Sequence, residues 1–243
     1  MKALILNSGI GKRMGEITKN HPKCMTELLD GETIISRQLK ELKEVGINDV
    51  LITTGPFEDK LIDYVNSLNL DLNIEFVNNE KYESTNYIYS IYKAKDKLDD
   101  DIIMMHGDLV FSEDVLEDVI NNSDSCMTVT STLPLPEKDF KAVIKDGKIK
   151  QVGIEFFRDA FAAQPLYKLK KEDWTKWLNS IINHVESGIT GVYAENALNL
   201  VTNFTNIRPL DIENRLCGEI DNLEDLENMR NRLLEEKTYA KRR

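Results

Sequence analysis

The chain has 243 residues, of which 41% are apolar and 30% charged, a profile typical of a folded globular protein that excludes a disordered or fibrous chain. Its 31 Lys and Arg stand against 42 Asp and Glu, which gives a formal net charge of −11. This acidity argues against a nucleic-acid partner held by phosphate neutralisation, although it leaves room for a local basic pocket.

The first half of the chain alternates predicted strands and helices. Short apolar runs predict strands over residues 3–6, 50–54, 74–77 and 101–108. Apolar spacing predicts helices over 33–45, 61–68 and 86–98, and Gly46 stands where the first of them needs a C-cap. Strands that alternate with helices indicate parallel pairing, and their non-alternating apolar character indicates a sheet covered on both faces.

The second half adds shorter strands and more helices. We predict a strand over 126–131 and a β-hairpin from 142–144 and 149–152, joined through Asp146-Gly147. Helices are predicted over 171–186, 195–203 and 223–236, and a frayed basic tail over 237–243. The fold class is therefore α/β: a single domain over 1–236, with a mixed, mostly parallel Rossmann-like sheet and helices on both faces. The hairpin and helices of the second half are expected to form a lid.

Neither a membrane anchor nor a disulfide framework is predicted. The sequence contains no run of 18 apolar residues, and Lys12 and Arg13 follow its first apolar run too soon for a secretory signal. Cys24, Cys126 and Cys217 are far apart and odd in number, so we interpret them as reduced packing residues. We therefore expect a cytoplasmic protein that does not insert into membranes.

A glycine-containing loop follows the first predicted strand and carries the strongest chemical signal. Residues 7–13 read Asn-Ser-Gly-Ile-Gly-Lys-Arg, and Pro22-Lys23 follow. Glycines let the backbone approach a phosphate, successive N–H groups bind anions, and Lys and Arg add positive charge. The loop is neither a dinucleotide fingerprint nor a Walker A loop. A plain tight turn also fits Gly-x-Gly, but these basic residues in an acidic chain favour a polyanionic ligand.

This loop resembles the signature loop of the nucleotidyltransferases that make activated sugars and alcohols, roughly L-A-A-G-x-G-x-R followed by P-K. Asn7 and Ser8 stand where that pattern has two alanines. Residues 31–35, Asp108 at a predicted strand end, and residues 218–221 (Gly-Glu-Ile-Asp) fall in family order, so the resemblance covers essentially the whole chain. It implies the GT-A-like fold of nucleotide-diphospho-sugar transferases.

The resemblance also implies which residues bind the nucleotide. Lys12 and Arg13 would hold the β- and γ-phosphates, and Lys23 would stabilise charge at the α-phosphate, so Arg13 and Lys23 are the expected catalytic residues. The complete expected nucleotide site comprises Asn7, Ser8, Gly9, Gly11, Lys12, Arg13, Lys23, Gly55, Thr85, Asn86 and Gly107. Residues 1–125 would mainly bind the nucleotide, and 126–222 would mainly bind the acceptor.

A polar and aromatic segment over residues 78–90 indicates the branch of the family. Its Thr85-Asn86 with a downstream Tyr-Ser is similar to phosphocholine and aminoalkylphosphonate cytidylyltransferases, whereas sugar-1-phosphate members usually carry a small Gly-Thr-Ala type sequence. The Asn86 amide is suited to reading a pyrimidine edge or a ribose. An N-cap at Ser84 or Thr85 also fits this segment, and both roles can hold together.

Two carboxylates far apart in the sequence are the candidate metal ligands. Asp108 follows an apolar strand, where ligands bind in open α/β sheets, and Asp221 precedes the last helix. On the residues alone, a turn position for Asp108 and a position near an N-cap for Asp221 are favoured over a metal site. The resemblance implies that both bind Mg²⁺, which favours carboxylate and phosphate oxygens.

The acceptor pocket is expected in the second half. Aromatic rings with carboxylates suit an ammonium or amine head group, and the candidates there are Glu155, Phe156, Tyr193 and Glu195, with Phe157 beside them. Phe156 and Phe157 also fit a core role. Lys138 and Lys141 fit either a phosphate contact or solvated side chains, while Trp174 and Trp177 are predicted to pack. His106, close to Asp108, is assigned no catalytic role.

The sequence therefore predicts an Mg²⁺-dependent enzyme that transfers CMP from CTP to a small phospho-alcohol or phosphonate, of the phosphocholine or 2-aminoethylphosphonate type, and releases pyrophosphate. Three alternatives remain: a sugar-1-phosphate nucleotidyltransferase using UTP or dTTP, a GT-A glycosyltransferase, and a nucleotide-sensing domain. The acceptor and the oligomeric state, a homodimer included, are left open.

Overall fold

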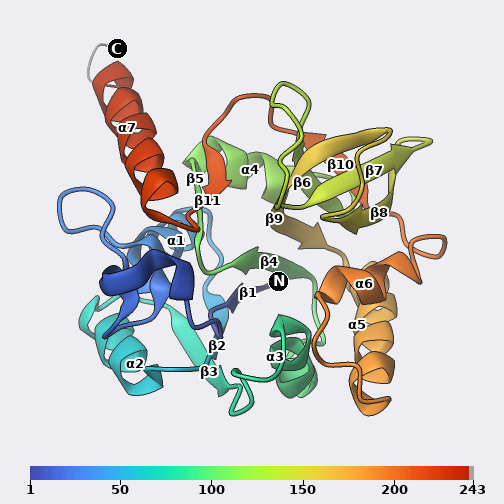
Figure 1. Ribbon diagram of the computed structural model, residues 1–243, viewed down its shortest axis with the longest axis horizontal. Helices are drawn as coiled ribbons and strands as arrows, with labels where there is room; N and C mark the ends of the chain where they lie inside the picture. The colour runs from blue at the N-terminus through green and yellow to red at the C-terminus, as the bar shows by residue number, and fades with distance from the viewer. Residues whose placement is uncertain (241–243) are drawn as a thin grey trace.

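The structure of the protein is a computed structural model, in which residues 1–240 are described. A mixed sheet crosses its centre (Figure 1), and its parallel half has the order β4-β1-β2-β3. These strands are β1 (Lys2–Leu6), β2 (Asp49–Thr54), β3 (Asn73–Asn78) and β4 (Ile102–His106). Each matches a predicted strand, which confirms the parallel pairing inferred from the alternation of strands and helices.

The sheet continues beyond β4 with a reversal of direction. There β9 (Ala160–Leu169) pairs antiparallel with β4 and with β6 (Cys126–Thr130), and β10 (Arg208–Asp211) pairs parallel with β6. The predicted hairpin is confirmed as β7 (Lys141–Lys145) and β8 (Lys148–Gly153), with β7 also paired to β9. Asp146 and Gly147 adopt φ of 54° and 70°, the two positive values that a type I′ turn requires.

Helices cover both faces of the sheet because β1 directs alternate apolar side chains to opposite sides. Ala3 and Ile5 pack toward α1 (Ile34–Glu44), α2 (Glu58–Ser67) and α4 (Glu113–Asn121). Leu4 and Leu6 pack toward α3 (Tyr87–Ala94), α5 (Lys171–Glu186) and α6 (Ala194–Asn199). The continuous apolar character of the strands thus reflects a sheet buried on both faces.

A two-stranded ribbon and a long helix pack the C-terminal part of the chain against its first half. Strand β11 (Cys217–Glu219) pairs antiparallel with β5 (Leu109–Phe111), which directly follows β4. Helix α7 (Leu223–Ala240) packs its first half over a third apolar cluster that includes Met14 and Val110, and its second half projects from the body (Figure 1). Short 3₁₀ helices are η1 (Lys12–Thr18), η2 (Lys23–Met25) and η3 (Lys95–Lys97).

Several boundaries differ from the sequence-based expectations. The N-cap of α3 is Asn86 itself, whose Oδ1 accepts the Tyr87 N–H at 2.7 Å, so the helix begins at Tyr87 and not at 86. Helix α6 ends at Asn199 rather than 203, and α7 continues through Ala240, so residues 237–240 of the predicted tail are helical. Residues 241–243 of that tail lie outside the described residues.

Expectations about the packing residues are confirmed. Trp174 and Trp177 are buried, and their indole N–H groups donate to the carbonyls of Leu98 and Ala194 at 2.9 and 2.8 Å. Each cysteine is buried and free, and burial raises the pKa of the Cys126 thiol to about 11. Within residues 1–240, none of the helices combines the length and apolar character that a membrane span requires.

Candidate active site

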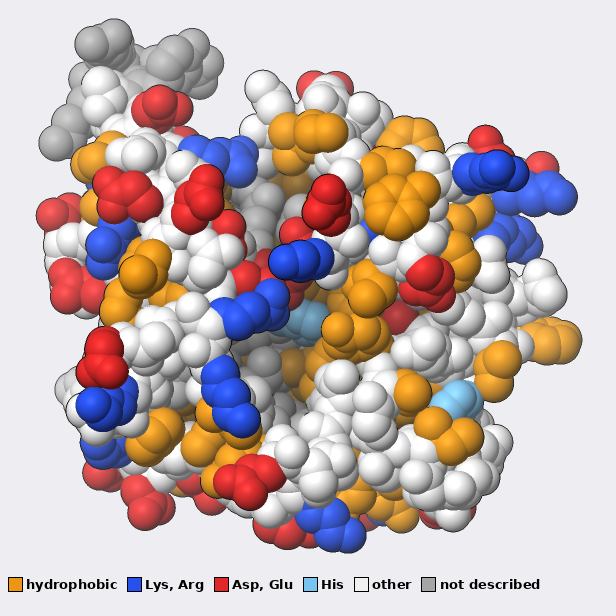
Figure 2. Space-filling view, viewed as in Figure 1, with side chains coloured by type: hydrophobic (Ala, Val, Ile, Leu, Met, Phe, Trp, Pro, Cys, Tyr) orange, Lys and Arg blue, Asp and Glu red, His pale blue; other side chains and the backbone are white. Residues whose placement is uncertain are grey.

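A cleft opens at the carboxyl ends of β1 and β4, the edge where open α/β sheets bind ligands. In the described part of the chain it consists of two adjoining cavities of about 260 and 280 Å³, which share Leu6, Gly9, Arg13, Asp108 and Asp221. We name the first the loop lobe, because Asn7, Gly11, Lys12, Lys23 and Gly107 also line it. We name the second the aromatic lobe, because Tyr82, Tyr87, Phe140 and Tyr193 also line it. Figure 2 shows the hollow, with Lys and Arg side chains along its rim.

The glycine loop is held rigidly against the sheet. Its first residue, Asn7, donates its N–H to the Thr53 carbonyl and hydroxyl at 3.2 and 3.1 Å. Gly11 has a φ of 69°, and Thr18 Oγ1 donates to its carbonyl at 2.9 Å. Gly55 lines neither lobe, but a Cβ there would lie 2.4 Å from the Ser8 carbonyl oxygen. We therefore assign Gly55 a packing role behind the loop in place of the expected nucleotide contact.

The expected metal ligands and the expected catalytic lysine meet in this cleft. Lys23 Nζ lies 2.5 Å from Asp108 Oδ2 and 2.7 Å from Asp221 Oδ1, and Arg13 Nη2 lies 2.8 Å from the same Asp221 oxygen. Burial by itself would lower the pKa of Lys23, but the two carboxylates raise it above its usual value. Burial would raise the pKa of Asp108, but the charges of Lys23 and His106 hold it below its usual value. The ammonium of Lys23 and the carboxylate of Asp108 therefore stabilise each other's charged form.

The ribbon of β5 and β11 explains how Asp221 reaches Asp108 across more than a hundred residues. Glu219 pairs with Leu109 in the antiparallel register, and the Ile220 N–H donates to the Asp108 carbonyl at 3.0 Å. On the other side, the buried Gln38 of α1 donates to the carbonyls of His106 and Leu109 at 2.8 Å each. These contacts fix the turn that carries Asp108 and the strand end that carries Asp221.

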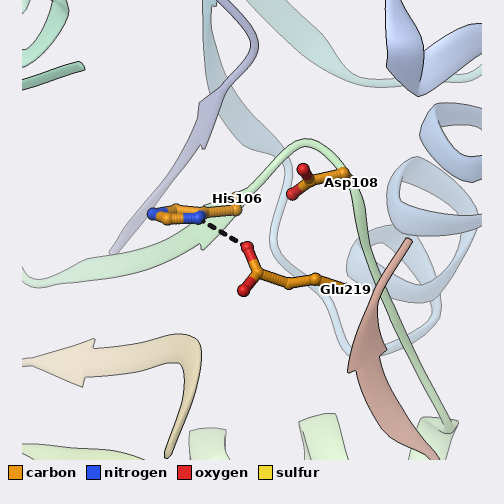
Figure 3. A group of neighbouring side chains, drawn as sticks. All are labelled: His106, Asp108 and Glu219. Atoms are coloured by element: carbon orange, nitrogen blue, oxygen red, sulfur yellow. Dashed lines mark hydrogen bonds and ion pairs between the residues drawn. The ribbon is translucent and has the colours of Figure 1, made fainter. Parts of the chain in front are cut away.

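His106 and Glu219 form a pair that the sequence analysis did not identify as part of the site (Figure 3). His106 Nδ1 lies 2.8 Å from Glu219 Oε1, and possible ligand atoms of these two residues and of Asp108 all lie within 4.8 Å of one another. Burial would lower the pKa of His106, but the hydrogen bond and charge of Glu219 raise it to about 9. Burial and the Asp108 charge raise the pKa of Glu219 to about 7. The nearness of His106 to Asp108 was visible in the sequence, but the partner from β11 was not.

Gly107 lets the side-chain amide of Asn7 lie close against the backbone of the turn before Asp108. An added Cβ would lie 1.7 Å from Asn7 Oδ1. Gly107→Ala is therefore expected to destabilise the protein by about 1–3 kcal/mol, as overpacking does. Urea unfolding measures this loss, and Asn7→Ala in the same chain should restore most of it because alanine removes the clashing amide. A Gly107→Ala variant as stable as the parent would contradict this packing.

In the polar segment before α3, some side-chain groups are used in hydrogen bonds that order the loop, and others have no partner among the described residues and face the cleft. Thr85 Oγ1 donates to the Lys81 carbonyl at 2.8 Å and accepts from Asn79 Nδ2 at 3.1 Å, so its hydroxyl orders the loop. The Asn86 carbonyl oxygen caps α3, which leaves its Nδ2 amide in the aromatic lobe with no partner among the described residues. Thr85 and Asn86 both line this lobe, as does Ser8, whose buried hydroxyl also lacks a partner in residues 1–240.

Of the four expected acceptor residues, only Tyr193 lines the cleft. Glu195 is 1% exposed and accepts hydrogen bonds from the Tyr87 and Tyr167 hydroxyls, so it supports the lobe from behind. Glu155 and Phe156 line neither lobe, whereas Ile154 from the same loop after β8 does line the cleft. We therefore withdraw the direct contacts expected of Glu155, Phe156 and Glu195.

The remaining wall of the aromatic lobe comes from residues to which the sequence analysis gave no definite role. Lys138, Asp139 and Phe140 line it from the loop before β7, and Asn79 and Tyr82 line it from the loop after β3. The Tyr193 ring lies 5.1 Å from the Phe140 ring and 5.9 Å from the Tyr87 ring, measured between centroids. Their signal in the sequence was only a concentration of polar and aromatic residues, which does not show which side chains face a cavity.

Comparison with known proteins identifies the family to which the chain belongs. The MobA-like NTP transferase domain family matches residues 3–224. A CTP:phosphoglutamine cytidylyltransferase of Campylobacter jejuni is 27% identical over 253 residues, covering 93% of this chain and 98% of that protein. A choline-phosphate cytidylyltransferase of Streptococcus pneumoniae is 36% identical over 98 residues, covering 40% of this chain and 41% of that protein.

Solved structures of nucleotidyltransferases share the fold. The CTP:phosphocholine cytidylyltransferase of Streptococcus pneumoniae superimposes with a TM-score of 0.76 at 21% identity, covering 96% of this chain and 98% of that chain. A UDP-glucose pyrophosphorylase bound to UDP-glucose has a TM-score of 0.77 at 16% identity, covering 100% and 99%. The predicted nucleotide-diphospho-sugar transferase fold is thus confirmed. The chain belongs to the MobA-like NTP transferase family and is a nucleotidyltransferase.

Proposed function

We propose that this enzyme transfers CMP from CTP to a small phosphate- or phosphonate-bearing acceptor and releases pyrophosphate. The observation that carries the proposal is the single cluster in which Lys23 contacts both Asp108 and Asp221 beside the glycine loop. CTP as the donor is supported by the relatives named above, which are CTP-dependent by name. The sugar-1-phosphate reaction with UTP or dTTP is the second candidate, because a pyrophosphorylase shares the fold.

The reaction needs positioning and charge neutralisation more than a protein nucleophile. An acceptor phosphate or phosphonate oxygen, already ionised at neutral pH, would attack the α-phosphorus in line, forming one P–O bond while the bond to pyrophosphate breaks. The amides of Gly9 and Gly11 and the side chains of Lys12 and Arg13 would hold the β- and γ-phosphates. The Lys23 ammonium would leave one of its two carboxylate partners and contact an α-phosphate oxygen instead. There it would neutralise the charge that develops in the transition state.

The same cluster has the chemistry of an Mg²⁺ site. Asp108 and Asp221 offer hard oxygen donors, and both already contact one cation, the Lys23 ammonium. Bound between them, Mg²⁺ would neutralise phosphate charge and orient the reacting oxygens. His106, hydrogen-bonded to Glu219 next to Asp108, would add a positive charge that favours the ionised form of that carboxylate.

In this proposal Asn86 would read cytosine. Because its carbonyl oxygen is used by the helix cap, the group left for the base is an NH₂ donor, which suits the acceptor at N3 of cytosine and not the N3–H of uracil. Asn86→Ser keeps an N-cap oxygen but removes the NH₂ group and shortens the side chain. We expect the KM for CTP to rise about tenfold while the melting temperature stays near that of the parent. Steady-state kinetics with CTP as the varied substrate test this, and an unchanged KM would contradict the role.

The aromatic lobe suits an acceptor with an ammonium or amine group. The rings of Tyr87, Phe140 and Tyr193 surround it, and Asp139 adds a carboxylate. Ring faces and a carboxylate together attract a compact cation. We therefore propose acceptors of the phosphocholine or 2-aminoethylphosphonate type.

A substrate panel tests the proposed function. The enzyme is incubated with Mg²⁺ and each of CTP, UTP, dTTP, ATP and GTP, paired in turn with phosphocholine, 2-aminoethylphosphonate and glucose 1-phosphate, and pyrophosphate release is recorded. We expect release with CTP and an amine-bearing acceptor. Release with UTP or dTTP and glucose 1-phosphate would instead establish the sugar-1-phosphate reaction.

A further inference from the structure

A fully buried lysine lies between the two loops that form the outer wall of the aromatic lobe. Lys141, the first residue of β7, is 0% exposed. Its Nζ donates to the carbonyls of Pro136 and Glu137 at 2.6 and 3.5 Å and lies 4.2 Å from the centroid of the Phe157 ring. Burial lowers the pKa of this ammonium. A charge is not held in such a place unless its contacts stabilise it.

The residues that the Lys141 ammonium contacts belong to two loops that line the cleft. Pro136 and Glu137 belong to the loop over residues 131–140, which contains no helix or strand and whose last residues, 138–140, line the aromatic lobe. Phe157 belongs to the loop over 154–159, whose first residue, Ile154, lines the same lobe. In the strand registers, Lys141 stands opposite Gly153 of β8 and Ala162 of β9, the residues near which the second loop begins and ends.

The first loop has few other restraints. Pro134 and Pro136 lack an N–H group and cannot donate backbone hydrogen bonds. At its ends, the Ser131 N–H donates to Asp211 Oδ1 at 3.2 Å, and the Phe140 carbonyl accepts from the Ala163 N–H at 3.0 Å. Between these ends, the Lys141 ammonium supplies the hydrogen bonds that tie residues 136 and 137 to the domain.

We propose that Lys141 is a positioning residue for the acceptor: its buried ammonium fixes both loops and thereby places Lys138, Asp139 and Phe140 around the bound head group. The inference rests on the proposed function, because it assigns the aromatic lobe to the acceptor. Lys141 lines neither lobe and does not contact the nucleotide loop, so its effect is expected on acceptor binding and not on CTP binding.

The test compares Lys141→Met, which keeps the length of the side chain and removes its donors, with Lys141→Arg, which keeps them. Lys145→Met is the matched control, since Lys145 is exposed at the other end of β7. For Lys141→Met we expect the KM for phosphocholine to rise about tenfold and the KM for CTP to stay within about twofold, with partial recovery in Lys141→Arg. Equal acceptor KM values in Lys141→Met and the parent would overturn the proposal.

A second readout does not depend on the reaction. Hydrogen exchange of the amides over 131–140 in the free protein should be faster in Lys141→Met and unchanged in Lys145→Met. Phe157→Ala, at a ring that is 54% exposed, should fold normally and shift exchange and acceptor KM in the same direction by a smaller factor. Parent-like exchange in both variants would overturn the anchoring. If the parent uses none of the tested acceptors, the proposed function fails, while the exchange data still decide whether Lys141 holds the loops.

Discussion

Replacing Lys23 with alanine is expected to lower kcat by about 10²-fold or more, the effect of removing one preorganised donor from developing transition-state charge. The Lys23 ammonium lies between Asp108 and Asp221, where the proposed function puts the reacting phosphate of the nucleotide. Single-turnover pyrophosphate release at saturating CTP measures the change in the chemical step. Lys19→Ala is the matched control, because Lys19 is exposed and pairs only with Glu16 within the described residues.

The same substitution should also reveal the repulsion between the two carboxylates. Without Lys23, Asp108 and Asp221 face each other in a partly buried site, where Arg13 still pairs with Asp221 and the charge of His106 still lies near Asp108. We expect a lower melting temperature in EDTA that Mg²⁺ partly restores, since a divalent cation can take the place of the ammonium. A kcat equal to that of the parent would remove Lys23 from the mechanism whatever its effect on stability.

Asp221→Asn is expected to lower kcat/KM by at least about 10²-fold and to raise the Mg²⁺ concentration needed for half-maximal rate. Asparagine keeps the shape of the side chain but removes the charge that Lys23 Nζ and Arg13 Nη2 contact at 2.7 and 2.8 Å. Initial rates over a series of Mg²⁺ concentrations measure both effects.

The control for this variant is Glu224→Gln, a neighbouring exposed carboxylate in the first turn of α7. It should leave the Mg²⁺ dependence unchanged, because general surface charge does not bind the ion. If Asp221→Asn shows the parent's Mg²⁺ dependence, Asp221 is not a metal ligand, and the assignment of the cluster as a metal site loses one of its two carboxylates.

The parallel half of the fold could be predicted because its signals are local. Each central strand is an uninterrupted apolar run, and the hairpin turn carries an Asp-Gly pair whose two positive φ values few other residues adopt. Strand β9 escaped prediction because Gln164 and Pro165 interrupt it, at the point where its register with β6 shifts between Met127 and Val129. Strands β5 and β10 are too short to give a pattern, and α4 was also missed.

The site residues likewise separate into those with a local signal in the sequence and those brought together only by the fold. The glycine loop, Lys23 and Asp108 could be identified because the loop is contiguous and the aspartate stands at a strand end. Their meeting with Asp221 depended on the resemblance, since it is made by the pairing of β11 with β5. Glu195 was misjudged for the same reason: its hydroxyl partners, Tyr87 and Tyr167, come from distant elements, and only the folded chain shows that they surround it.

The most direct test of this account asks whether the divalent ion touches the α-phosphate. CTP with sulfur in place of one α-phosphate oxygen exists as two diastereomers, and Mg²⁺ binds oxygen in preference to sulfur, whereas Cd²⁺ accepts sulfur. We predict that one diastereomer supports pyrophosphate release with Mg²⁺, that Cd²⁺ rescues the other, and that Asp221→Asn abolishes this rescue. The same preference between diastereomers with both ions would contradict an ion held by Asp108 and Asp221 at the reacting phosphorus.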